Sequence, residues 1–431
     1  MSDPTRNPPP AGAAVAEPGP SPAAQAEAAA PTDADAIRFV LLLGRALHTY
    51  GYAAHALEEV LGGAAARLGL RGQFFSTPTS IFASFGPQDH QRTYLIRVEP
   101  GDVDLGKLAE LDAVTTRVLR GELSVAEGAQ RIELIAGARP RYGPVATTIA
   151  FGLASAAASR FLGGGLREIA VASLIGFTTG FLALWAARFA PLARVFEPVA
   201  ALTASAAAST LGVLVGGFSV YNATLAGLIV LVPGLSLTVA MTELSTRHLV
   251  SGTSRLSGAF ALFLAIAFGV ALGARLVGSL LGSPVSAEPV PLPAWTGWAA
   301  LVVAPLAFTV LLRAAPRDAP WIVLAGAVAV LGGRLGAQAL GPELGVFAGA
   351  VAVGIASNLY ARRLDRPAPV LLVPGILLLV PGSIGFRSLA SLLDREVVLG
   401  VETAFRMILM AVALVAGILV AGVVTPPRRI T

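Results

Sequence analysis

Cysteine is absent from this chain of 431 residues, and charged side chains are scarce. The absence of cysteine excludes disulfides, thiolate zinc sites and a cysteine nucleophile. Only 13% of the residues are Asp, Glu, Lys or Arg, whereas a soluble domain carries about 25%. A chain so poor in charge cannot cover a large globule with a polar surface. The composition therefore favours a membrane protein and disfavours a soluble enzyme.

Histidine and lysine are also rare, and the common catalytic motifs are missing. Four histidines leave little for a histidine-rich metal site, so we expect no metal and no cofactor. Lys107 is the single lysine beside 30 arginines, and in a membrane chain this basic excess indicates cytoplasmic loops, not nucleic acid. The sequence has no G-x-S-x-G, H-E-x-x-H or phosphate-loop motif, which argues against an ATP-driven pump.

What charge there is divides the chain into two parts. Residues 1–142 hold 16 of the 26 acidic residues, and the remainder is apolar. The boundaries that we predict are a disordered Pro/Ala-rich tail over 1–33, a cytoplasmic α/β domain over 34–141, a first membrane repeat over 142–282, an extracytoplasmic loop over 283–294, a second membrane repeat over 295–425 and a cytoplasmic tail over 426–431.

The α/β domain is predicted from short periodic segments. Helical spacing of apolar residues predicts a first helix that is capped by Thr32 or Asp33 and broken at Gly51. Further helices are predicted over about 53–69, 104–120 and 124–137, with Gly69 and Gly121 as stops. Two β-rich stretches, 73–85 and 92–99, are predicted to form a hairpin. The polar turn Thr77-Pro78-Thr79-Ser80 interrupts the first stretch, and we interpret it as a bulge because proline cannot donate to a ladder.

Beyond Gly143, apolar runs have the length of about 20 residues that crosses a bilayer. The predicted spans are approximately 143–162, 167–187, 196–216, 220–242, 256–281, 295–313, 320–340, 343–361, 368–387 and 400–422. Arginines concentrate at alternate ends of these spans, and the loop over 283–294 has none. This bias predicts a multi-pass membrane protein with both termini inside.

One short sequence recurs within the apolar part. Leu231-Val232-Pro233-Gly234 reappears 148 residues later as Leu379-Val380-Pro381-Gly382. Each copy would hold about five helices, and an odd number requires the second copy to be inverted in the membrane. The predicted fold is a polytopic α-helical membrane protein of about ten helices in two inverted repeats. Such repeats share a site near the midplane, at broken helices.

Candidate substrate-binding residues lie at and near the predicted breaks. Pro-Gly pairs at 233–234, 374–375 and 381–382 interrupt the fourth and ninth spans, where freed backbone groups must be satisfied by protein or a water-lined cavity. Helix ends there carry partial charges suited to a carboxylate or an ammonium. The candidates are Asn222, Thr224, Pro233, Gly234, Ser236, Thr238, Pro381, Gly382, Ser383, Arg387 and Arg406.

Two acidic residues inside apolar segments are candidates for proton coupling or for binding a substrate ammonium. Glu243 precedes Arg247 by four residues, and Glu402 opens the tenth span four residues before Arg406. This spacing places each acid and base on one helical face. A local ion pair near the interface is the alternative.

The α/β domain contributes a weaker group. His55 lies three and four residues before Glu58 and Glu59, so the three side chains can share a helical face. An acid–base pair alone is weak evidence of hydrolysis, since the spacing specifies no nucleophile.

Several segments resemble the bacterial threonine/serine exporter family. The segments are residues 50–59, 72–75 and 77–85, Arg97-Val98-Glu99-Pro100-Gly101, residues 104–108 and Val380-Pro381-Gly382-Ser383-Ile384-Gly385-Phe386-Arg387. The soluble-domain motif includes His55, Glu58, Glu59, Thr77, Pro78, Thr79 and Ser80. The resemblance covers about residues 36–424 and implies a single-chain exporter of small hydroxylated amino acids in the bacterial cytoplasmic membrane, driven by the proton gradient. Split members of the family are associated with export of small dicarboxylates.

The sequence therefore predicts secondary-active export of threonine and serine, with no enzymatic activity. The expected partners are the lipid bilayer, the amino acid and protons, without nucleic acid, and a homo-oligomer stays open. Three alternatives remain: an exporter of dicarboxylates such as succinate, a membrane-tethered hydrolase that uses the α/β domain, and a passive channel.

Overall fold

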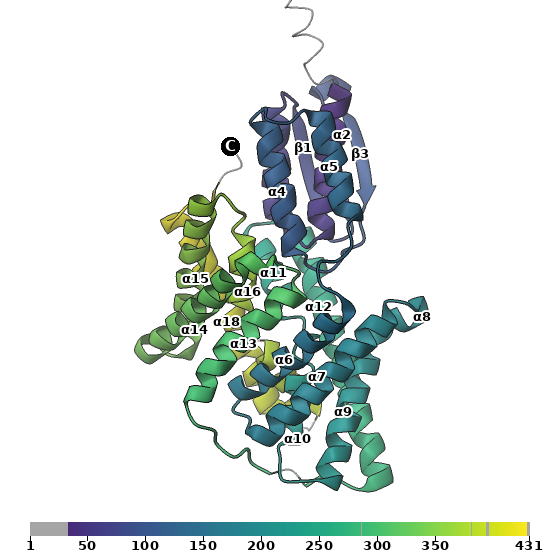
Figure 1. The fold of residues 1–431 in the computed structure, drawn as a ribbon, viewed down its shortest axis with the longest axis vertical. Helices are drawn as coiled ribbons and strands as arrows, with labels where there is room; N and C mark the ends of the chain where they lie inside the picture. Colours follow the sequence, from purple (N-terminus) through teal and green to yellow (C-terminus); the bar gives the residue numbers. More distant parts are fainter. Residues whose placement is uncertain (1–32, 286, 381, 394–395, 429–431) are drawn as a thin grey trace, which may run out of the picture.

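The computed structural model describes residues 33–428, except for 286, 381 and 394–395. The predicted N-terminal tail thus lies, apart from Asp33, outside the described residues, as do Pro381 and the end of the C-terminal tail. An N-terminal domain stands at one end of a larger helical part, and the connection over 283–294 lies at the opposite end (Figure 1).

The N-terminal domain consists of four helices and three strands. The bounds are α2 (Asp33–Thr49), α3 (Ala54–Arg67), β1 (Gly72–Thr77), β2 (Ser80–Phe85), the short η1 (Gln88–His90), β3 (Arg92–Arg97), α4 (Leu105–Leu119) and α5 (Val125–Gly137). The predicted helices are confirmed to within a few residues. Asp104 and Ser124 begin α4 and α5, because each side chain accepts a hydrogen bond from the third residue of its helix.

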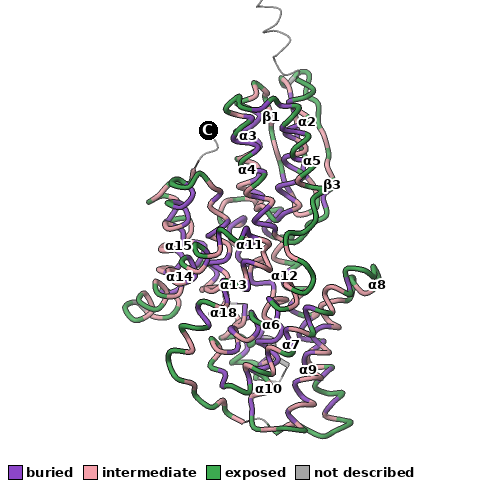
Figure 2. The backbone as a smooth tube through the Cα atoms, viewed as in Figure 1, coloured by how far each residue is buried: buried purple, intermediate pink, exposed green. Residues whose placement is uncertain are grey.

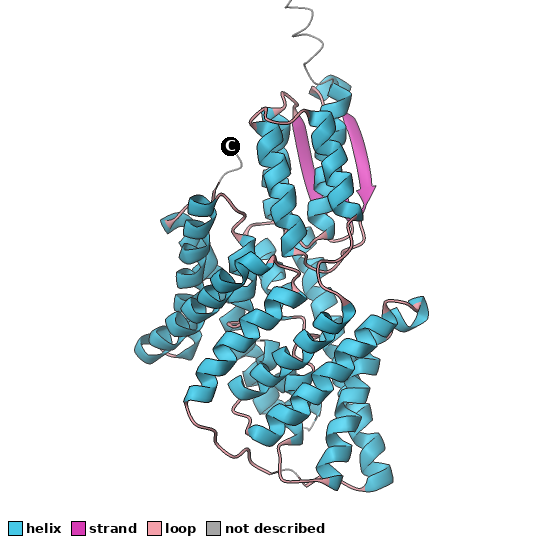
Figure 3. Cartoon of the chain, viewed as in Figure 1, coloured by secondary structure: helices cyan, strands magenta, loops and turns pink. Residues whose placement is uncertain are grey.

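The sheet corrects one prediction. The stretch 73–85 is not one bulged strand but two strands, and Thr77 pairs with Ser80 across a two-residue turn at Pro78 and Thr79. Thr77 Oγ1 and Ser80 Oγ are 2.8 Å apart and fasten the turn. The antiparallel order is β1-β2-β3. Helices cover one face of the sheet (Figure 3), and the other exposes the cross-strand row Phe75, Phe82 and Leu95.

The helical part contains the remaining helices, two of them single short turns. The bounds are α6 (Pro144–Phe161), α7 (Leu166–Ala186), α8 (Ala190–Ala193), α9 (Phe196–Leu214), α10 (Val220–Gly227), α11 (Gly234–Ser245), α12 (Leu249–Leu281), α13 (Trp295–Leu311), η2 (Pro316–Asp318), α14 (Ala319–Leu340), α15 (Pro342–Leu364), α16 (Pro369–Leu377), α17 (Gly382–Leu393) and α18 (Val397–Val424). Seven helical segments among the described residues are long and apolar enough to cross a membrane.

The N-terminal domain is not a separate globule, because its core continues into the helical part. Ala314 and Ile322, from the connection between α13 and α14 and from α14 itself, belong to the same buried apolar cluster as Phe39 and Leu43 of α2. Leu105 N–H, the first amide of α4, donates to the carbonyl of Leu312 at 2.9 Å. Buried segments lie on both sides of this boundary (Figure 2).

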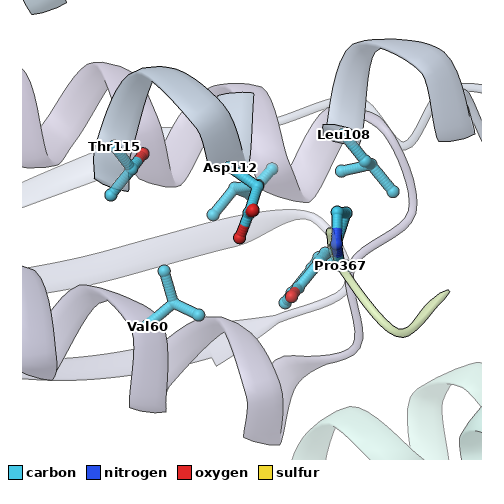
Figure 4. A pocket seen from close by; sticks show the side chains of 7 residues that line it. Val60, Leu108, Asp112, Thr115 and Pro367 are labelled. Atoms are coloured by element: carbon cyan, nitrogen blue, oxygen red, sulfur yellow. The ribbon is translucent and has the colours of Figure 1, made fainter. Parts of the chain in front are cut away.

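The C-terminal end of the chain closes the same boundary from another side. Arg428 Nη1 lies 2.8 Å from Asp112 Oδ2 of α4, and its Nε lies 2.9 Å from Asp365 Oδ1. Asp112 faces Pro367 across a small pocket between the two parts (Figure 4). Burial is the main cause that raises the pKa of Asp112, against the opposing effect of Arg428. The guanidinium therefore ties the domain to the α15–α16 connection.

We expect Gly128→Ala to destabilise the protein. A Cβ at Gly128 of α5 would collide with Val118 Cγ2 and approach Phe39 Cε2 to 2.9 Å, and overpacking of this kind costs about 1–3 kcal/mol. The measurement is the thermal unfolding midpoint of the full chain in detergent. Gly62→Ala in α3 is the control, because its Cβ would meet nothing within 4 Å and should stabilise the helix by about 0.5–1 kcal/mol. Equal midpoints for both variants would contradict this packing.

Candidate functional site

Two helices of the helical part are broken. The chain leaves the helix after α10 and resumes it as α11 at Gly234, and it leaves after α16 and resumes as α17 at Gly382. Pro233 has no N–H to continue the ladder, and proline disfavours helical backbone at the preceding residue. The third predicted break is wrong, because Pro374 lies inside α16 without ending it.

The two breaks touch each other at a place that we name the crossing (Val232, Gly234, Val380 and Gly382). A Cβ on Gly234 would lie 2.5 Å from Val380 Cγ1, and a Cβ on Gly382 would lie 2.8 Å from Val232 Cγ1. The Cβ position on Gly382 also lies only 3.5 Å from the Cα of Gly234. Glycine is thus required on both sides, because any side chain would push the two breaks apart.

Four helix ends meet near the crossing. The N-termini of α11 and α17 begin there, and the C-termini of α10 and α16 end a few residues before it. Helix N-termini present unpaired N–H groups and partial positive charge, and C-termini present carbonyls and partial negative charge. The arrangement offers complementary charges for a small molecule that carries both a carboxylate and an ammonium.

The segments that follow the two breaks match in detail. The bounds of α11 and α17 differ by 148 residues at both ends, and so do the starts of α12 and α18. His248 and Glu396, which precede those starts, have φ, ψ of −84°, 64° and −83°, 64°. Each accepts a hydrogen bond of 2.9 Å from the amide four residues later. The internal similarity that Val-Pro-Gly suggested therefore extends to a whole helix–turn–helix unit.

Most of the predicted polar site residues bond to nearby backbone. The hydroxyls of Thr224 and Thr238 donate to carbonyls one turn earlier, at 2.8 and 3.1 Å. Asn222 Nδ2 donates to the Leu162 carbonyl at 3.0 Å and so links α10 to the end of α6. Ser236 and Ser383 are half-buried. These contacts satisfy polar atoms inside an apolar environment, which is the packing role that small hydroxyl residues commonly have.

The two predicted arginines and Glu402 lie away from the crossing. Arg387 is exposed on α17. Arg406 Nε lies 3.3 Å from Glu343 Oε1, and its Nη2 lies 3.9 Å from Glu402 Oε1. The predicted pairing of Glu402 with Arg406 on one helical face is therefore confirmed. Glu402 lies in the second turn of α18 and does not open it, because α18 begins at Val397.

Glu243 has a different environment from the one that its spacing predicts. The expected pairing with Arg247 is wrong, because α11 ends at Ser245 and Arg247 is exposed with φ of 66°. The Glu243 carboxylate is fully buried and lies 3.2 Å from Arg255 Nε of α12. Ser251 Oγ donates to it at 2.8 Å. The first amide of α3, Ala54 N–H, donates to Glu243 Oε1 at 3.0 Å.

The predicted acid–base group of the N-terminal domain meets this carboxylate. Glu58 accepts a hydrogen bond from Ser76 N–H at 2.7 Å and pairs with His248 Nε2 at 3.3 Å. The His55 and His248 rings have their centroids 6.1 Å apart. We name this group the junction (Ala54, Glu58, Glu243, His248 and Arg255). Two predictions that the sequence kept separate thus belong to one polar cluster between the domain and the α11–α12 turn.

The remaining residues of the soluble-domain motif lie on the surface or in the β1–β2 turn. Glu59 is exposed. Pro78 and Thr79 form the β1–β2 turn, and the Thr79 carbonyl accepts from Val98 N–H at 2.9 Å. Among the residues that the structure describes, no group of three or more His, Asp or Glu side chains is placed to hold a metal ion.

His48 is buried beside the junction. Its Nε2 donates to the Thr77 carbonyl at 2.7 Å, and its buried Nδ1 has no hydrogen-bond partner among the described residues. A second proton would sit on Nδ1 without an acceptor. Burial, followed by the nearby charge of Arg255, lowers the pKa of His48, although the bond to Thr77 raises it. Burial also lowers the pKa of His55.

Sequence reasoning missed Arg255, His248 and Arg428. Arg255 follows Glu243 by twelve residues across a turn, and Arg428 lies 316 residues from Asp112. No local spacing predicts either pair. Sequence reasoning also missed Glu168, which is buried and accepts a hydrogen bond from Ser219 N–H at 2.7 Å. An acidic residue in an apolar run is the signal that could have found Glu168.

Comparison with known families agrees with this architecture. Residues 38–277 match a family model described as "Putative threonine/serine exporter". The chain belongs to the threonine/serine exporter family. Residues 298–424 match a second model, "Threonine/Serine exporter, ThrE". The two matches divide near the 283–294 connection. The resemblance that the sequence motifs indicated is confirmed.

Curated relatives of the chain are fungal membrane proteins. The chain is 26% identical over 363 residues to Pheromone-regulated membrane protein 10 of Pichia sorbitophila, covering 81% of this chain and 36% of that protein. It is 27% identical over 361 residues to the protein of the same name from Eremothecium gossypii, covering 81% and 48%. The chain thus spans about a third to a half of these relatives. No solved structure matches it.

The family and the apolar helices together make this a polytopic helical membrane protein of an exporter family. Its helices contact lipid.

Acidification should destabilise the protein through His48. Because the pKa of the folded ring lies below its ordinary value of 6.5, its contribution to stability is complete above that value and is lost as pH falls through the lowered pKa. We expect the unfolding midpoint of the wild type in detergent to fall between pH 8 and pH 5.5. The midpoint of His48→Gln should fall by less over the same range. His90→Gln is the control, because His90 is exposed, and its midpoint should fall as much as that of the wild type. An equal fall for His48→Gln would contradict the assignment.

Proposed function

We propose that this chain exports small hydroxylated amino acids, threonine and serine, by a secondary-active mechanism with its substrate site at the crossing. The observation that carries the proposal is the contact between two broken helices, Gly234 against Val380 and Gly382 against Val232, in a chain of the exporter family. Broken helices that meet inside the protein are the usual place of substrate sites in transporters.

We further propose that the helical part is built from two inverted repeats of five spans. The shared 148-residue offset of α11 with α17 and of α12 with α18 supports this proposal. Ten spans result if α10–α11 and α16–α17 each count as one and α6 and α13 are included. The C-terminal end of α13 contacts the N-terminal domain through Leu312, whereas α6 starts on the domain side, so the first spans of the two halves run in opposite directions.

The charges at the crossing favour an amino acid over a dicarboxylate. The N-terminal amides of α11 and α17 suit one carboxylate, and the carbonyls left free after α10 and α16 suit an ammonium. A dicarboxylate needs cations for both ends, and the two predicted arginines lie elsewhere: Arg387 is exposed, and Arg406 pairs with Glu343 and Glu402.

The proposed orientation places the N-terminal domain and both termini in the cytoplasm. Helix ends and turns on the domain side carry Arg247, Arg313 and Arg317, with Arg362 and Arg363 at the end of α15. The connection over 283–294, at the other side, has no basic residue. This asymmetry is the one that positive-inside topology requires. Coupling to protons stays part of the proposal, with Glu402 as the candidate carboxylate.

The test is efflux from proteoliposomes preloaded with labelled threonine, with and without an uncoupler, and with succinate in a parallel set. We expect threonine efflux that the uncoupler reduces. Succinate efflux without threonine efflux would replace the substrate, and flux that ignores the proton gradient would indicate a channel. Efflux of neither threonine nor succinate would contradict the exporter proposal.

Gly234→Ala should abolish most threonine efflux while the protein stays folded. The new methyl would lie 2.5 Å from Val380 Cγ1 and separate the two breaks, and overpacking of about 1–3 kcal/mol displaces the helix ends that hold substrate. Initial efflux rates are compared with Gly258→Ala on α12, whose Cβ meets nothing within 4 Å and which should transport normally. Wild-type rates for Gly234→Ala would place the site elsewhere.

A further inference from the structure

The helix α3 begins without a capping side chain of its own. Its N-cap residue is Ala53, which has no side chain that can accept a hydrogen bond. The first turn of a helix leaves amides without intrahelical partners, and a buried start therefore needs an acceptor from elsewhere. Glu243 supplies it, from 189 residues away in sequence, by accepting from Ala54 N–H at 3.0 Å.

The charge of Glu243 suits this position as well as its geometry. A carboxylate at a helix N-terminus gains from the partial positive charge there. The same carboxylate is fully buried, and Arg255 and Ser251 complete its contacts. A buried charge requires such compensation, and the contact with Ala54 N–H is made only while α3 is seated on the α11–α12 turn.

Glu243 also lies on the helix that carries one half of the crossing. It is nine residues after Gly234 in α11, which corresponds to about 14 Å along a rigid helix axis. A displacement of α3 therefore moves the carboxylate end of α11, and the helix transmits the movement to the break.

Comparison of the two halves of the chain isolates this feature. The residues before α12 and α18, His248 and Glu396, have the same backbone conformation. The positions 148 residues after Glu243, Ser251 and Arg255 are, however, Ser391, Leu399 and Thr403. The matching positions of the second half therefore hold no equivalent of the Glu243–Arg255 pair, whereas Glu243 is the residue that contacts the first amide of α3. The turn itself does not need this pair.

We propose that Glu243 is a positioning residue, through which the N-terminal domain holds the broken helix α10–α11 in register with α16–α17. The domain is a clamp on the first broken helix, and the substrate does not touch this carboxylate. The effect on transport rests on the proposed function, whereas the anchoring contact does not.

The anchoring contact is tested by hydrogen exchange of the full chain in detergent, observed on peptides that cover the first turn of α3. Glu243→Gln keeps an acceptor oxygen but removes the charge, and we expect exchange of these amides to rise about tenfold, since charge-assisted hydrogen bonds are about twice as strong as neutral ones. Glu402→Gln is the matched control, because its carboxylate is on α18 and pairs with Arg406. It should leave α3 unchanged.

A charge exchange separates anchoring from a simple ion pair. Glu243→Arg with Arg255→Glu restores opposite charges between α11 and α12 but places a cation at the start of α3. We expect this double variant to fold and to keep rapid exchange in α3. Recovery of wild-type protection would overturn the proposal, because the ion pair alone would then suffice.

Threonine efflux kinetics give the second readout. For Glu243→Gln we expect the maximal rate to fall about tenfold with KM changed less than twofold, because positioning affects the broken helix and not the substrate contacts. A raised KM with unchanged α3 exchange would make Glu243 a substrate ligand and overturn the proposal. If the wild type exports no threonine, the exchange measurements still decide the anchoring contact, and the proposed function fails separately.

Discussion

The arrangement of this protein depends on the backbone groups that two broken helices leave unpaired. In a bilayer such groups are tolerated only when protein or a water-lined cavity surrounds them. Here the breaks lie against each other, with Gly234 and Gly382 allowing the close approach. The hydroxyl groups of α10 and α11 satisfy nearby carbonyls instead of facing lipid. The same requirement brings helix ends of both signs close to the crossing, where we propose that the substrate binds.

A second feature is the way in which the N-terminal domain joins the helical part. The domain shares its apolar core with Ala314 and Ile322, and Arg428 and Glu243 make charged contacts with it from two other sides. Apolar burial holds two surfaces together without fixing a direction, whereas the charged contacts define the register. The domain is thus positioned to influence α11 directly.

Export and hydrolysis make different demands on the junction. A hydrolase would need a free general base, but both oxygens of Glu58 have partners, Ser76 N–H and His248. Positioning requires the opposite, namely that every buried polar group be occupied when the parts are joined. The Nδ1 atoms of His48 and His55 are exceptions, because neither has a hydrogen-bond partner among the described residues.

The sequence by itself determined the class of protein, the family and the local elements. Low charge and long apolar runs require a membrane, and periodicity with glycine stops gave the helices of the N-terminal domain. The Val-Pro-Gly repeat located both breaks, because proline acts on its own helix. Short-range effects of this kind depend on residues that are close in the sequence.

Tertiary structure alone decided which charged residues meet. Glu243 pairs with Arg255 and not with Arg247, because the helix ends at Ser245 and the chain reverses. Pro374 stays within α16, since a proline can lie in a helix when packing surrounds the freed carbonyl. Asp112 forms an ion pair with Arg428, which lies at the other end of the chain. Such pairs depend on how separate elements dock, and no spacing along the sequence encodes that.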